Sequence, residues 1–334
     1  MSEDSILVTG GAGYIGSHTV RLLASQGRRV VVLDNLAFGH ESAIVDSSVE
    51  LVVGDVGDPE LVVSLFKKYS FSAVIHFAAF AYVGESVTDP LKYYWNNTAK
   101  PIALLQVMQQ FGCKNFVFSS TCATYGSPEK IPIDESNPQQ PINPYGRSKL
   151  MVEQILTDCE HAWGLRSACL RYFNASGCSE DGKIGEDHDP ETHLIPRVLM
   201  AITGEIDSLE VYGTDYPTPD GTCIRDYIHV EDLAEAHGLA LDYLLEGNHS
   251  IKCNLGTGKG ISVKEIITAA EDVSGKKVPV RYSERREGDP AMLIADPKLA
   301  LEVLQWKAKH TDVNKIVDSA WQWMNGPNKG HFKD

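Results

Sequence analysis

Two residues that could perform acid–base chemistry together lie four positions apart in the stretch Asn143-Pro-Tyr-Gly-Arg-Ser-Lys149. On a helix, Tyr145 and Lys149 would share one face, with the lysine ammonium near the tyrosine phenol. A free phenol, with a pKa of about 10, is a poor base at neutral pH, but a nearby cation favours the phenolate. The pair predicts an acid–base site. The alternative is a chance spacing in which a packed ring lies beside a solvated amine.

A strand, a glycine loop and a helix follow one another near the start of the sequence. The apolar run 5–9 leads into Gly10-Gly-Ala-Gly-Tyr-Ile-Gly16, and helical residues continue to about Ser25. Such a loop lets the backbone approach a pyrophosphate, and the helix N-terminus supplies N–H groups and partial positive charge. The spacing is G-x-x-G-x-x-G, and a tight turn without a ligand is the alternative. The predicted cofactor-binding residues of this loop are Gly10, Gly13, Tyr14, Ile15 and Gly16.

Acidic residues follow the next two apolar runs. The run 29–33 ends at Asp34, which is placed to accept hydrogen bonds from both hydroxyls of an adenosine ribose. Because a carboxylate there repels a 2′-phosphate, the sequence favours NAD over NADP. After a third run at 50–54, Asp55 and Val56 could meet the adenine edge, and a helix or turn cap is an equal explanation for Asp55.

The positioning elements alternate between strand and helix. Further strand-like runs and long helical stretches are at 73–79, about 90–111, 115–121, 145–163 and 167–173. This alternation predicts an α/β fold with a doubly wound parallel sheet of the Rossmann type, and ligands outside the carboxyl ends of its strands. Asp34, Asp55, Ala79 and Thr121 fall at such ends, and Thr121 offers a hydroxyl there. His76 is predicted to pack inside the sheet.

A second, smaller α/β lobe is predicted where the composition changes. Residues 177–193 are rich in Gly, Asp and Glu and mark a surface excursion. The predicted division is a dinucleotide-binding domain at 1–176, to which 224–258 returns, and a substrate lobe at 177–223 and 259–334.

The segment 256–260 resembles a phosphate loop, but no Ser or Thr follows its Gly-Lys pair, so it fails the Walker pattern. We predict a turn into a helix that starts at a capping box formed by Ser262 and Glu265.

Composition narrows the class of protein. The chain has 334 residues and a net charge of −15, which argues against nucleic-acid or anionic-membrane partners. No apolar run approaches the roughly 18 residues of a membrane span, and the first strand begins too early to leave room for a secretory leader. The 7 cysteines are scattered without a C-x-x-C pair, so neither disulfides nor a metal site is predicted. A reduced, cytoplasmic setting is expected.

Taken together, these motifs resemble the extended short-chain dehydrogenase/reductases, and within them the UDP-glucose (UDP-galactose) 4-epimerase family. The matching segments run in order over nearly the whole chain, at 8–18, 170–174, 225–230, 254–256 and 285–289. The resemblance implies an isomerase with bound NAD and a UDP-sugar substrate. It also implies a homodimer joined through the helices of about 90–111 and 145–163.

The resemblance assigns roles to individual residues. Tyr145 would be the acid/base, Thr121 would fill the catalytic Ser/Thr position, and Lys149 would bind the nicotinamide ribose and lower the tyrosine pKa. On the cofactor side it adds Asn35, Phe77, Ala78, Ala79, Asn97 and Phe173. On the substrate side it implies Thr121, Tyr145, Asn174, His193, Leu194, Tyr212, Arg225, Arg286, Asp289 and Leu293.

The two arginines make physical sense because guanidinium forks match diphosphate oxygens. For Arg225 alone, a surface ion pair with the neighbouring Asp226 is the alternative.

Three positions depart from the family pattern. A lysine common in bacterial members is replaced by Ala81, and an asparagine before the substrate-loop leucine is replaced by His193. The third is Leu293, where a large Tyr restricts the family's pocket to hexoses and a small residue admits N-acetylhexosamines. Leucine is intermediate, so UDP-N-acetylhexosamine or UDP-pentose substrates stay open.

The hypothesis is reversible inversion at C4 of a UDP-hexose, UDP-galactose to UDP-glucose. Tyr145 removes the 4-OH proton while the C4 hydride passes to NAD, the 4-keto sugar turns, and hydride returns to its other face. A nucleotide-sugar 4,6-dehydratase is the nearest alternative, but Cys122-Ala-Thr124 offers no carboxylate after Thr121. A one-way reductase and a non-catalytic NAD-sensing scaffold are further alternatives.

Overall fold

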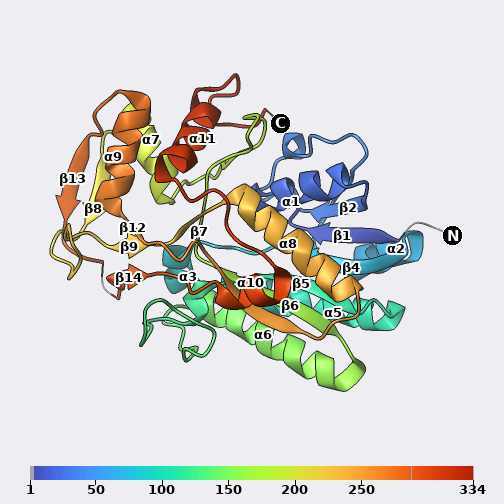
Figure 1. Cartoon of the computed structure of the whole chain (residues 1–334). Coiled ribbons are helices and arrows are strands. Elements are labelled where there is room, and N and C mark those ends of the chain that lie inside the picture. The colour runs from blue at the N-terminus through green and yellow to red at the C-terminus, as the bar shows by residue number, and fades with distance from the viewer. Residues whose placement is uncertain (1–3, 287, 334) are drawn as a thin grey trace.

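The computed structural model describes residues 4–286 and 288–333. Glu287, inside the 285–289 motif, lies outside the described residues. Residues 1–3, at the start of the predicted dinucleotide-binding domain, and residue 334, at the end of the predicted substrate lobe, also lie outside them. Figure 1 shows a twisted central sheet with helices on both sides and a second group of elements at one end. No helix of the described residues is long and apolar enough to cross a membrane.

A 7-stranded sheet of parallel pairs forms the centre, in the order β11-β6-β5-β4-β1-β2-β3. Its strands are β1 (Ser5–Thr9), β2 (Arg29–Asp34), β3 (Glu50–Val53), β4 (Phe71–His76), β5 (Asn115–Thr121), β6 (Arg166–Tyr172) and β11 (Ile251–Leu255). Strand order reverses between β1 and β4, which is where open α/β sheets bind ligands. The predicted doubly wound parallel sheet is confirmed.

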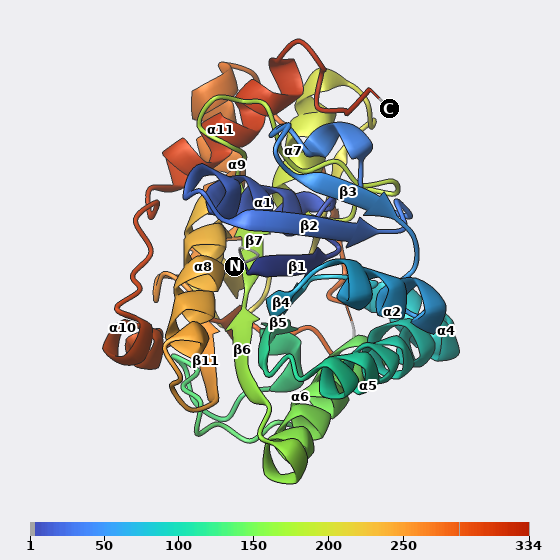
Figure 2. The same cartoon turned by 90° about the vertical axis from the view of Figure 1, so that its right-hand side faces the viewer.

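Helices cover both faces of this sheet. Figure 2 shows α1 (Tyr14–Ser25) and α8 (Val230–Leu245) on one side, and α2 (Pro59–Lys68), α5 (Lys100–Phe111) and α6 (Pro144–Trp163) on the other. Each face has its own apolar core, because the strands are buried on both sides. The short helix α10 (Lys298–Leu304) extends the α8 side through Leu304 and the following Trp306.

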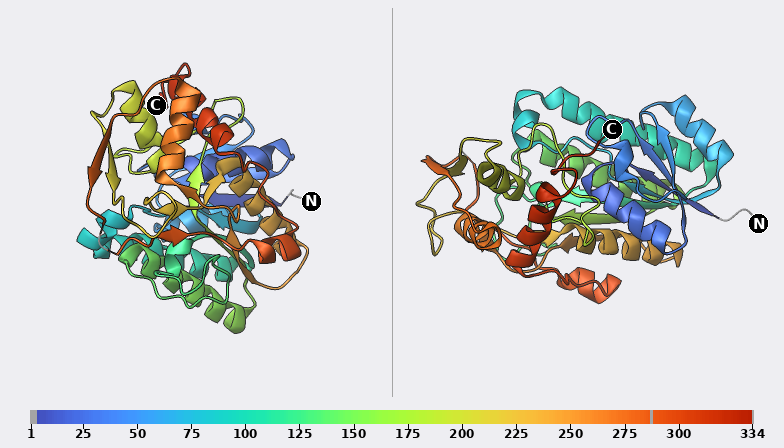
Figure 3. Two further views of the ribbon diagram at one scale, coloured as in Figure 1. Left: turned by 60° about the vertical axis from the view of Figure 1, so that its left-hand side comes forward. Right: turned by 90° about the horizontal axis from the view of Figure 1, so that it is seen from above.

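The second group of elements lies beyond the carboxyl ends of the strands, at the end of the sheet opposite the N-terminus (Figure 3). It contains α7 (Leu194–Thr203), β8 (Leu209–Tyr212), α9 (Val263–Ser274), β13 (Val280–Ser283) and α11 (Val313–Asn325). A separate apolar core joins these elements. Short strands lie between the two groups: β7 (Asn174–Ser176), β9 (Ile224–Arg225), β10 (Tyr227–His229), β12 (Ile261–Ser262) and β14 (Met292–Leu293).

Local sequence signals mark several helix ends. Asp58 caps α2 by accepting from the Glu60 and Leu61 amides, and Gly164 ends α6 in the left-handed conformation. Ser262 and Glu265 form the predicted capping box of α9.

The predicted helical stretch 90–111 is helical throughout, with one irregular turn. It consists of α4 (Pro90–Tyr94), a π-helical turn (Trp95–Ala99) and α5, and α3 (Val83–Thr88) precedes it. Pro101 explains the irregular turn, because it lacks an amide N–H and its ring clashes with the carbonyl four residues earlier. Two short 3-10 turns, Glu41–Ala43 and Cys122–Thr124, complete the elements.

His76 packs in the sheet as predicted, with its Nδ1 2.6 Å from Thr9 Oγ1. Burial lowers its pKa to about 3, as it lowers the pKa of three other buried histidines. These are His18 (to about 4), His229 (to about 3) and His237 (to about 4).

These histidines predict acid-labile folding. Between pH 6.5 and about 4, these histidines are protonated in the unfolded chain but stay neutral in the native protein. Protons therefore bind preferentially to the unfolded chain, and the free energy of unfolding falls as the pH falls. Each such proton contributes a slope of about 1.4 kcal/mol per pH unit. Urea unfolding across this range measures the slope. His237→Leu should reduce it by about one proton, and the control His249→Gln, at an exposed site, should not.

Candidate active site

The first turn of α1 can accept an anion from outside the chain. Its N-cap, Gly13, gives no side-chain hydrogen bond within the described residues, and the turn carries no acidic residue. A Cβ on Gly13 would meet Gly10 O at 3.5 Å, whereas one on Gly16 would lie 2.2 Å from the same atom. The N–H groups of this turn, and the room that a glycine leaves at position 13, fit a cofactor pyrophosphate.

The loop after β4 closes against this turn. The amides of Phe77 and Ala78 donate to Thr9 O at 2.8 and 3.1 Å, and a Cβ on Gly10 would lie 2.5 Å from Ala78 N. The predicted segments 10–16 and 77–79 are thus side by side. Phe77, Ala78 and Ala79 lie in the loop beyond β4 rather than in the strand, which ends at His76.

Asp34 lies at the carboxyl end of β2, as predicted. Its carboxylate accepts hydrogen bonds from the Ala12 and Leu36 amides, both at 2.9 Å. Burial raises the Asp34 pKa, and these hydrogen bonds oppose the rise. The contact with Ala12 fixes the acid beside the glycine loop, where a dinucleotide ribose would lie.

Asp55 has the partners of a turn cap. It accepts from Gly57 N at 2.7 Å, from Lys100 Nζ at 2.6 Å and from Asn35 Nδ2 at 3.1 Å. Burial raises its pKa, but these hydrogen bonds outweigh burial and leave the pKa below its usual value. Val56 is buried in the core under α2 and α5.

Asn97 is held in the π-helical turn and is 1% exposed. Its amide pairs with both the N–H and the C=O of Phe80 at 2.9 Å, and donates to Ser148 Oγ at 3.3 Å. It therefore joins the loop after β4 to α6, the helix that carries Tyr145.

Tyr145 and Thr121 meet where α6 crosses the end of β5. Asn143 caps α6 by accepting from Gly146 N at 2.8 Å, which places Tyr145 in the first turn. The phenol is 7% exposed. Burial raises its pKa well above the usual range, the neighbouring Tyr172 adds to the rise, and a hydrogen bond with Thr121 opposes it.

Lys149 lies on the same helix face, fully inside the protein. Its ammonium donates to Ser119 O at 2.9 Å and lies 4.9 Å from the Phe118 ring centroid. Burial lowers the pKa of Lys149 to about 7, and the Glu153 carboxylate opposes this. Burial dominates the Tyr145 phenol in the protein alone, so the lowering of its pKa by Lys149 stays a prediction.

Residues predicted on the substrate side gather around the short strands between the two groups. The backbone N–H of Asn174 donates to Asp226 O at 3.0 Å, and β14 pairs with β9 so that Leu293 faces Arg225 in register. The Arg225 guanidinium pairs with Asp289. The alternative pairing of Arg225 with Asp226 is therefore wrong.

Asp226 is completely buried and binds the loop that resembled a phosphate loop. It accepts from Thr257 N at 2.8 Å, Gly258 N at 3.0 Å and Ala295 N at 3.2 Å. A carboxylate of the chain itself occupies the amides of this loop, so it is a structural turn and not an anion site.

The remaining substrate-side residues line two neighbouring surfaces. The Arg286 guanidinium lies 3.9 Å from the Tyr212 ring centroid. Leu293 packs on a small cluster that contains Phe173 and Tyr125. Phe173 directly follows Tyr172, which pairs in register with Thr121, so this cluster borders the acid–base residues.

His193 and Leu194 lie at the start of α7. His193 is the N-cap residue, and its Nδ1 lies 2.8 Å from Glu186 Oε1 and 3.0 Å from Glu191 Oε1. Leu194 packs on the core of the second group. Likewise, the Tyr14 hydroxyl donates to Gly177 O at 2.5 Å, so its side chain faces the excursion 177–193.

Sequence reasoning missed a buried ion pair beneath the acid–base residues. Arg171 donates from Nε and Nη2 to Glu153 at 2.9 and 2.6 Å, and Ser120 Oγ donates to the same carboxylate at 2.6 Å. The helical spacing offered a signal, since Glu153 lies four residues after Lys149 and eight after Tyr145, on one helix face.

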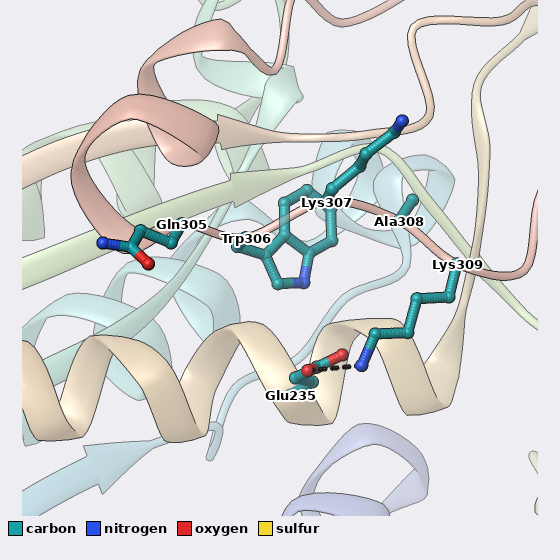
Figure 4. A pocket seen from close by; sticks show the side chains of 6 residues that line it. All are labelled: Glu235, Gln305, Trp306, Lys307, Ala308 and Lys309. Carbon is teal, nitrogen blue, oxygen red and sulfur yellow. Dashed lines mark hydrogen bonds and ion pairs between the residues drawn. The ribbon is translucent and has the colours of Figure 1, made fainter.

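A surface pocket lies away from all predicted site residues. Figure 4 shows it between α8 and the segment after α10, with an ion pair between Glu235 and Lys309 across it. Its lining residues are Glu235, Gln305, Trp306, Lys307, Ala308 and Lys309.

Comparison with known proteins agrees with this geometry. Residues 6–256 match the model of the NAD dependent epimerase/dehydratase family. The chain belongs to this family. The resemblance stated from the sequence is thereby confirmed, and so is the prediction of NAD as its cofactor.

Relatives in the epimerase/dehydratase family extend over nearly the whole chain. The UDP-glucose 4-epimerase of Lacticaseibacillus casei is 49% identical over 326 residues, 98% of each chain. The crystal structure of UDP-glucose 4-epimerase from Brucella ovis in complex with NAD is 53% identical, with a TM-score of 0.93 over 95% of this chain and 97% of that one. The Bifidobacterium longum enzyme in complex with NAD+ and UDP is 40% identical, with a TM-score of 0.93 over 98% and 100%.

Proposed function

We propose that this chain is an NAD-dependent UDP-glucose 4-epimerase that interconverts UDP-galactose and UDP-glucose. The observation that carries the proposal is the position of Tyr145 on the first turn of α6, close to Thr121 at the end of β5, with Lys149 bound to Ser119 O of the same strand at 2.9 Å. The relatives that share the chain's length are UDP-glucose 4-epimerases, one of them solved with NAD+ and UDP. Neither the dehydratase nor the scaffold alternative is favoured by them.

The acid–base step belongs to Tyr145. It accepts the proton of the sugar 4-OH as C4 is oxidised to a ketone, and returns that proton to O4 when C4 is reduced. Thr121 orients the phenol and the reacting hydroxyl. NAD, when bound, supplies the acceptor that takes hydride from C4 and returns it to the other face.

In the protein alone, burial raises the Tyr145 pKa and favours the neutral phenol. The phenol must therefore lose its own proton before it can accept that of the sugar 4-OH, and positive charge on Lys149, on the same helix face, would favour this loss. Its pKa of about 7 lets it exchange a proton near neutral pH.

The other site residues are proposed in the following roles. Gly10, Gly13, Tyr14, Ile15 and Gly16 hold the pyrophosphate of NAD, and Asp34, Asn35, Asp55, Val56, Phe77, Ala78, Ala79, Asn97, Lys149 and Phe173 surround the rest. Asn174, His193, Leu194, Tyr212, Arg225, Arg286 and Asp289 hold the UDP-sugar, with the two guanidiniums on the diphosphate. A diphosphate would take the place of Asp289 at Arg225, or bind beside it.

The direct test uses NAD-loaded protein and UDP-galactose without added oxidant or reductant. NMR should show conversion of UDP-galactose to UDP-glucose until the two nucleotide sugars reach equilibrium. A 4-keto-6-deoxy product would instead support the dehydratase, and no conversion by folded, NAD-loaded protein would reject catalysis by this route.

Substrate breadth is predicted to depend on Leu293. A tyrosine there would fill space beside Phe173 and should disfavour a bulky C2 substituent. We expect Leu293→Tyr to lower the activity on UDP-N-acetylgalactosamine relative to UDP-galactose by at least about 10-fold, the scale of a pocket filled by a few methylenes. Competition between the two sugars measures the ratio. The control Leu301→Tyr changes a leucine that is 50% exposed on α10 and should leave the ratio unaltered.

A homodimer and a cytoplasmic location are also proposed. Val87, Leu91 and Trp95 are 62%, 76% and 68% exposed along the α3–α4 edge, an apolar surface that a second copy would cover. Sedimentation of the wild type and of Leu91→Glu tests this: the variant should sediment as a monomer. The cytoplasmic proposal rests on seven unpaired cysteines.

A further inference from the structure

Four side chains with metal-binding atoms converge in the excursion that precedes α7. Glu186, His188, Glu191 and His193 each offer one ligand atom, and these atoms all lie within 4.8 Å of one another. Their spacing, Glu-x-His-x-x-Glu-x-His, is compact in the sequence. The sequence assigned only His193 a role, on the substrate side, and its scattered cysteines predicted no metal site.

The distances suit a four-coordinate ion. His188 Nδ1 lies 3.3 Å from Glu186 Oε1 and 3.5 Å from Glu191 Oε2, and His193 Nδ1 lies 2.8 and 3.0 Å from the Oε1 atoms of the two glutamates. A tetrahedral Zn²⁺ with bonds of about 2.0–2.2 Å needs ligand atoms about 3.3–3.6 Å apart. The His188 contacts already have this separation, and the His193 contacts reach it with a small rotation of the ring.

Polar atoms that make no hydrogen bond within the described residues lie at the same place. His188 Nδ1 is buried and meets the Glu186 and Glu191 carboxylates only as ion pairs, at 3.3 and 3.5 Å. The Tyr82 hydroxyl is buried without a hydrogen bond as well, on a ring 6.3 Å from that of His188. Buried polar groups in native proteins are nearly always satisfied, so these atoms are open to a further ligand.

Ligand chemistry favours a zinc-like ion. Each of the two glutamate side chains is 7% exposed and lies within 3.5 Å of both imidazoles. Arg197 donates to the backbone carbonyl of Glu191 at 3.2 Å. A mixed imidazole and carboxylate set selects zinc-like ions, whereas Mg²⁺ and Ca²⁺ prefer all-oxygen ligands.

We propose that Glu186, His188, Glu191 and His193 form a structural site for a divalent transition metal, with Zn²⁺ as the best-matched ion. The metal would fix the excursion to the start of α7, and hence the position of Leu194. It would also anchor the excursion over α1, since the Tyr14 ring lies 6.2 Å from that of His188. All four positions are filled by side chains, so the ion would hold the loop and not activate water. His193 would bind the ion through Nδ1, which faces the glutamates, and keep Nε2 for the UDP-sugar.

A second histidine group provides a matched control. His229, Glu231 and His310 also approach one another, but there the imidazole nitrogens have protein partners. His229 Nδ1 accepts from Glu231 N at 3.2 Å, and His310 Nδ1 lies 2.9 Å from Asp232 Oδ1.

The test measures zinc on untagged, NAD-loaded protein stripped with a chelator and then dialysed against Zn²⁺. We expect about one zinc ion per chain by mass spectrometry of the metal. His188→Gln should weaken zinc binding by at least about 100-fold, beyond the 10–100-fold typical of changes outside the ligand shell. His310→Gln should keep the wild-type stoichiometry.

A second measurement stands if His188→Gln fails to fold. Co²⁺ added to stripped wild-type protein should give the visible absorption of a four-coordinate ion, and one equivalent of Zn²⁺ should abolish it. Wild-type protein that binds neither ion, or zinc that His188→Gln retains and His310→Gln loses, would overturn the proposal. Because metal content is read directly, this result is independent of whether the proposed epimerase activity is found.

Discussion

Replacing Tyr145 by phenylalanine should lower turnover of UDP-galactose by about 10²–10⁴-fold, the range for removing a general acid–base group. The ring stays in its buried position, and the change deletes only the hydroxyl that contacts Thr121. Binding of NAD and UDP should therefore change little. Conversion followed by NMR, together with calorimetric titration of UDP, separates the two effects.

Tyr93→Phe is the matched control for Tyr145→Phe. Tyr93 is fully buried too, but its hydroxyl donates to Glu85, which Lys92 also pairs. The Tyr93→Phe variant should keep a turnover rate within a few-fold of that of the wild type. Near-normal turnover in Tyr145→Phe would remove this residue from the mechanism, and equal losses in both variants would point to a packing defect.

Removing Glu153 should have the largest effect on stability. Glu153 and Arg171 are 0% and 3% exposed, and Glu153→Ala would leave the guanidinium buried without its carboxylate. Breaking one partner of such a pair costs about 3–5 kcal/mol of the free energy of unfolding. Urea denaturation of the variant measures this cost, and soluble yield reports it if the variant unfolds.

The double variant Glu153→Leu/Arg171→Met is the control for an unpaired charge. It removes both charges and should recover much of the lost stability, because apolar residues of similar size can replace a buried pair. A loss below about 1 kcal/mol in Glu153→Ala would mean that water or Tyr125 satisfies Arg171 without help.

Catalysis and stability are linked at this pair. Ser119 binds the Lys149 ammonium, the next residue Ser120 binds Glu153, and the Glu153 carboxylate raises the Lys149 pKa against burial. A folded Glu153→Gln protein should therefore have a Lys149 pKa below that of the wild type.

Much of the fold could be predicted because it depends on local patterns. Apolar runs that are buried on both faces, such as β1 and β5, alternate with helices whose capping residues lie nearby in the sequence. The π-helical turn at Trp95–Ala99 was not predicted. It depends on Pro101, which cannot donate a helical hydrogen bond, and on the tertiary contact of Asn97 with Phe80 O.

The sequence by itself determined which residues stand at the strand ends: the glycine loop, Asp34, Thr121, and the pair Tyr145 and Lys149. The period of apolar residues and the spacing of functional residues are properties of neighbouring positions in the sequence, so they can be predicted without the tertiary structure.

Only the tertiary structure decided partners and charge states. In the folded chain Arg225 pairs with Asp289 and not with its neighbour Asp226. Asp226 instead accepts hydrogen bonds from the amides of Thr257 and Gly258. The Glu186 and Glu191 carboxylates both contact His193. The tertiary structure also buried the Tyr145 phenol, which raises the pKa of that residue. The reason is physical: desolvation and long-range contacts depend on which surfaces meet in space, and no local spacing records that.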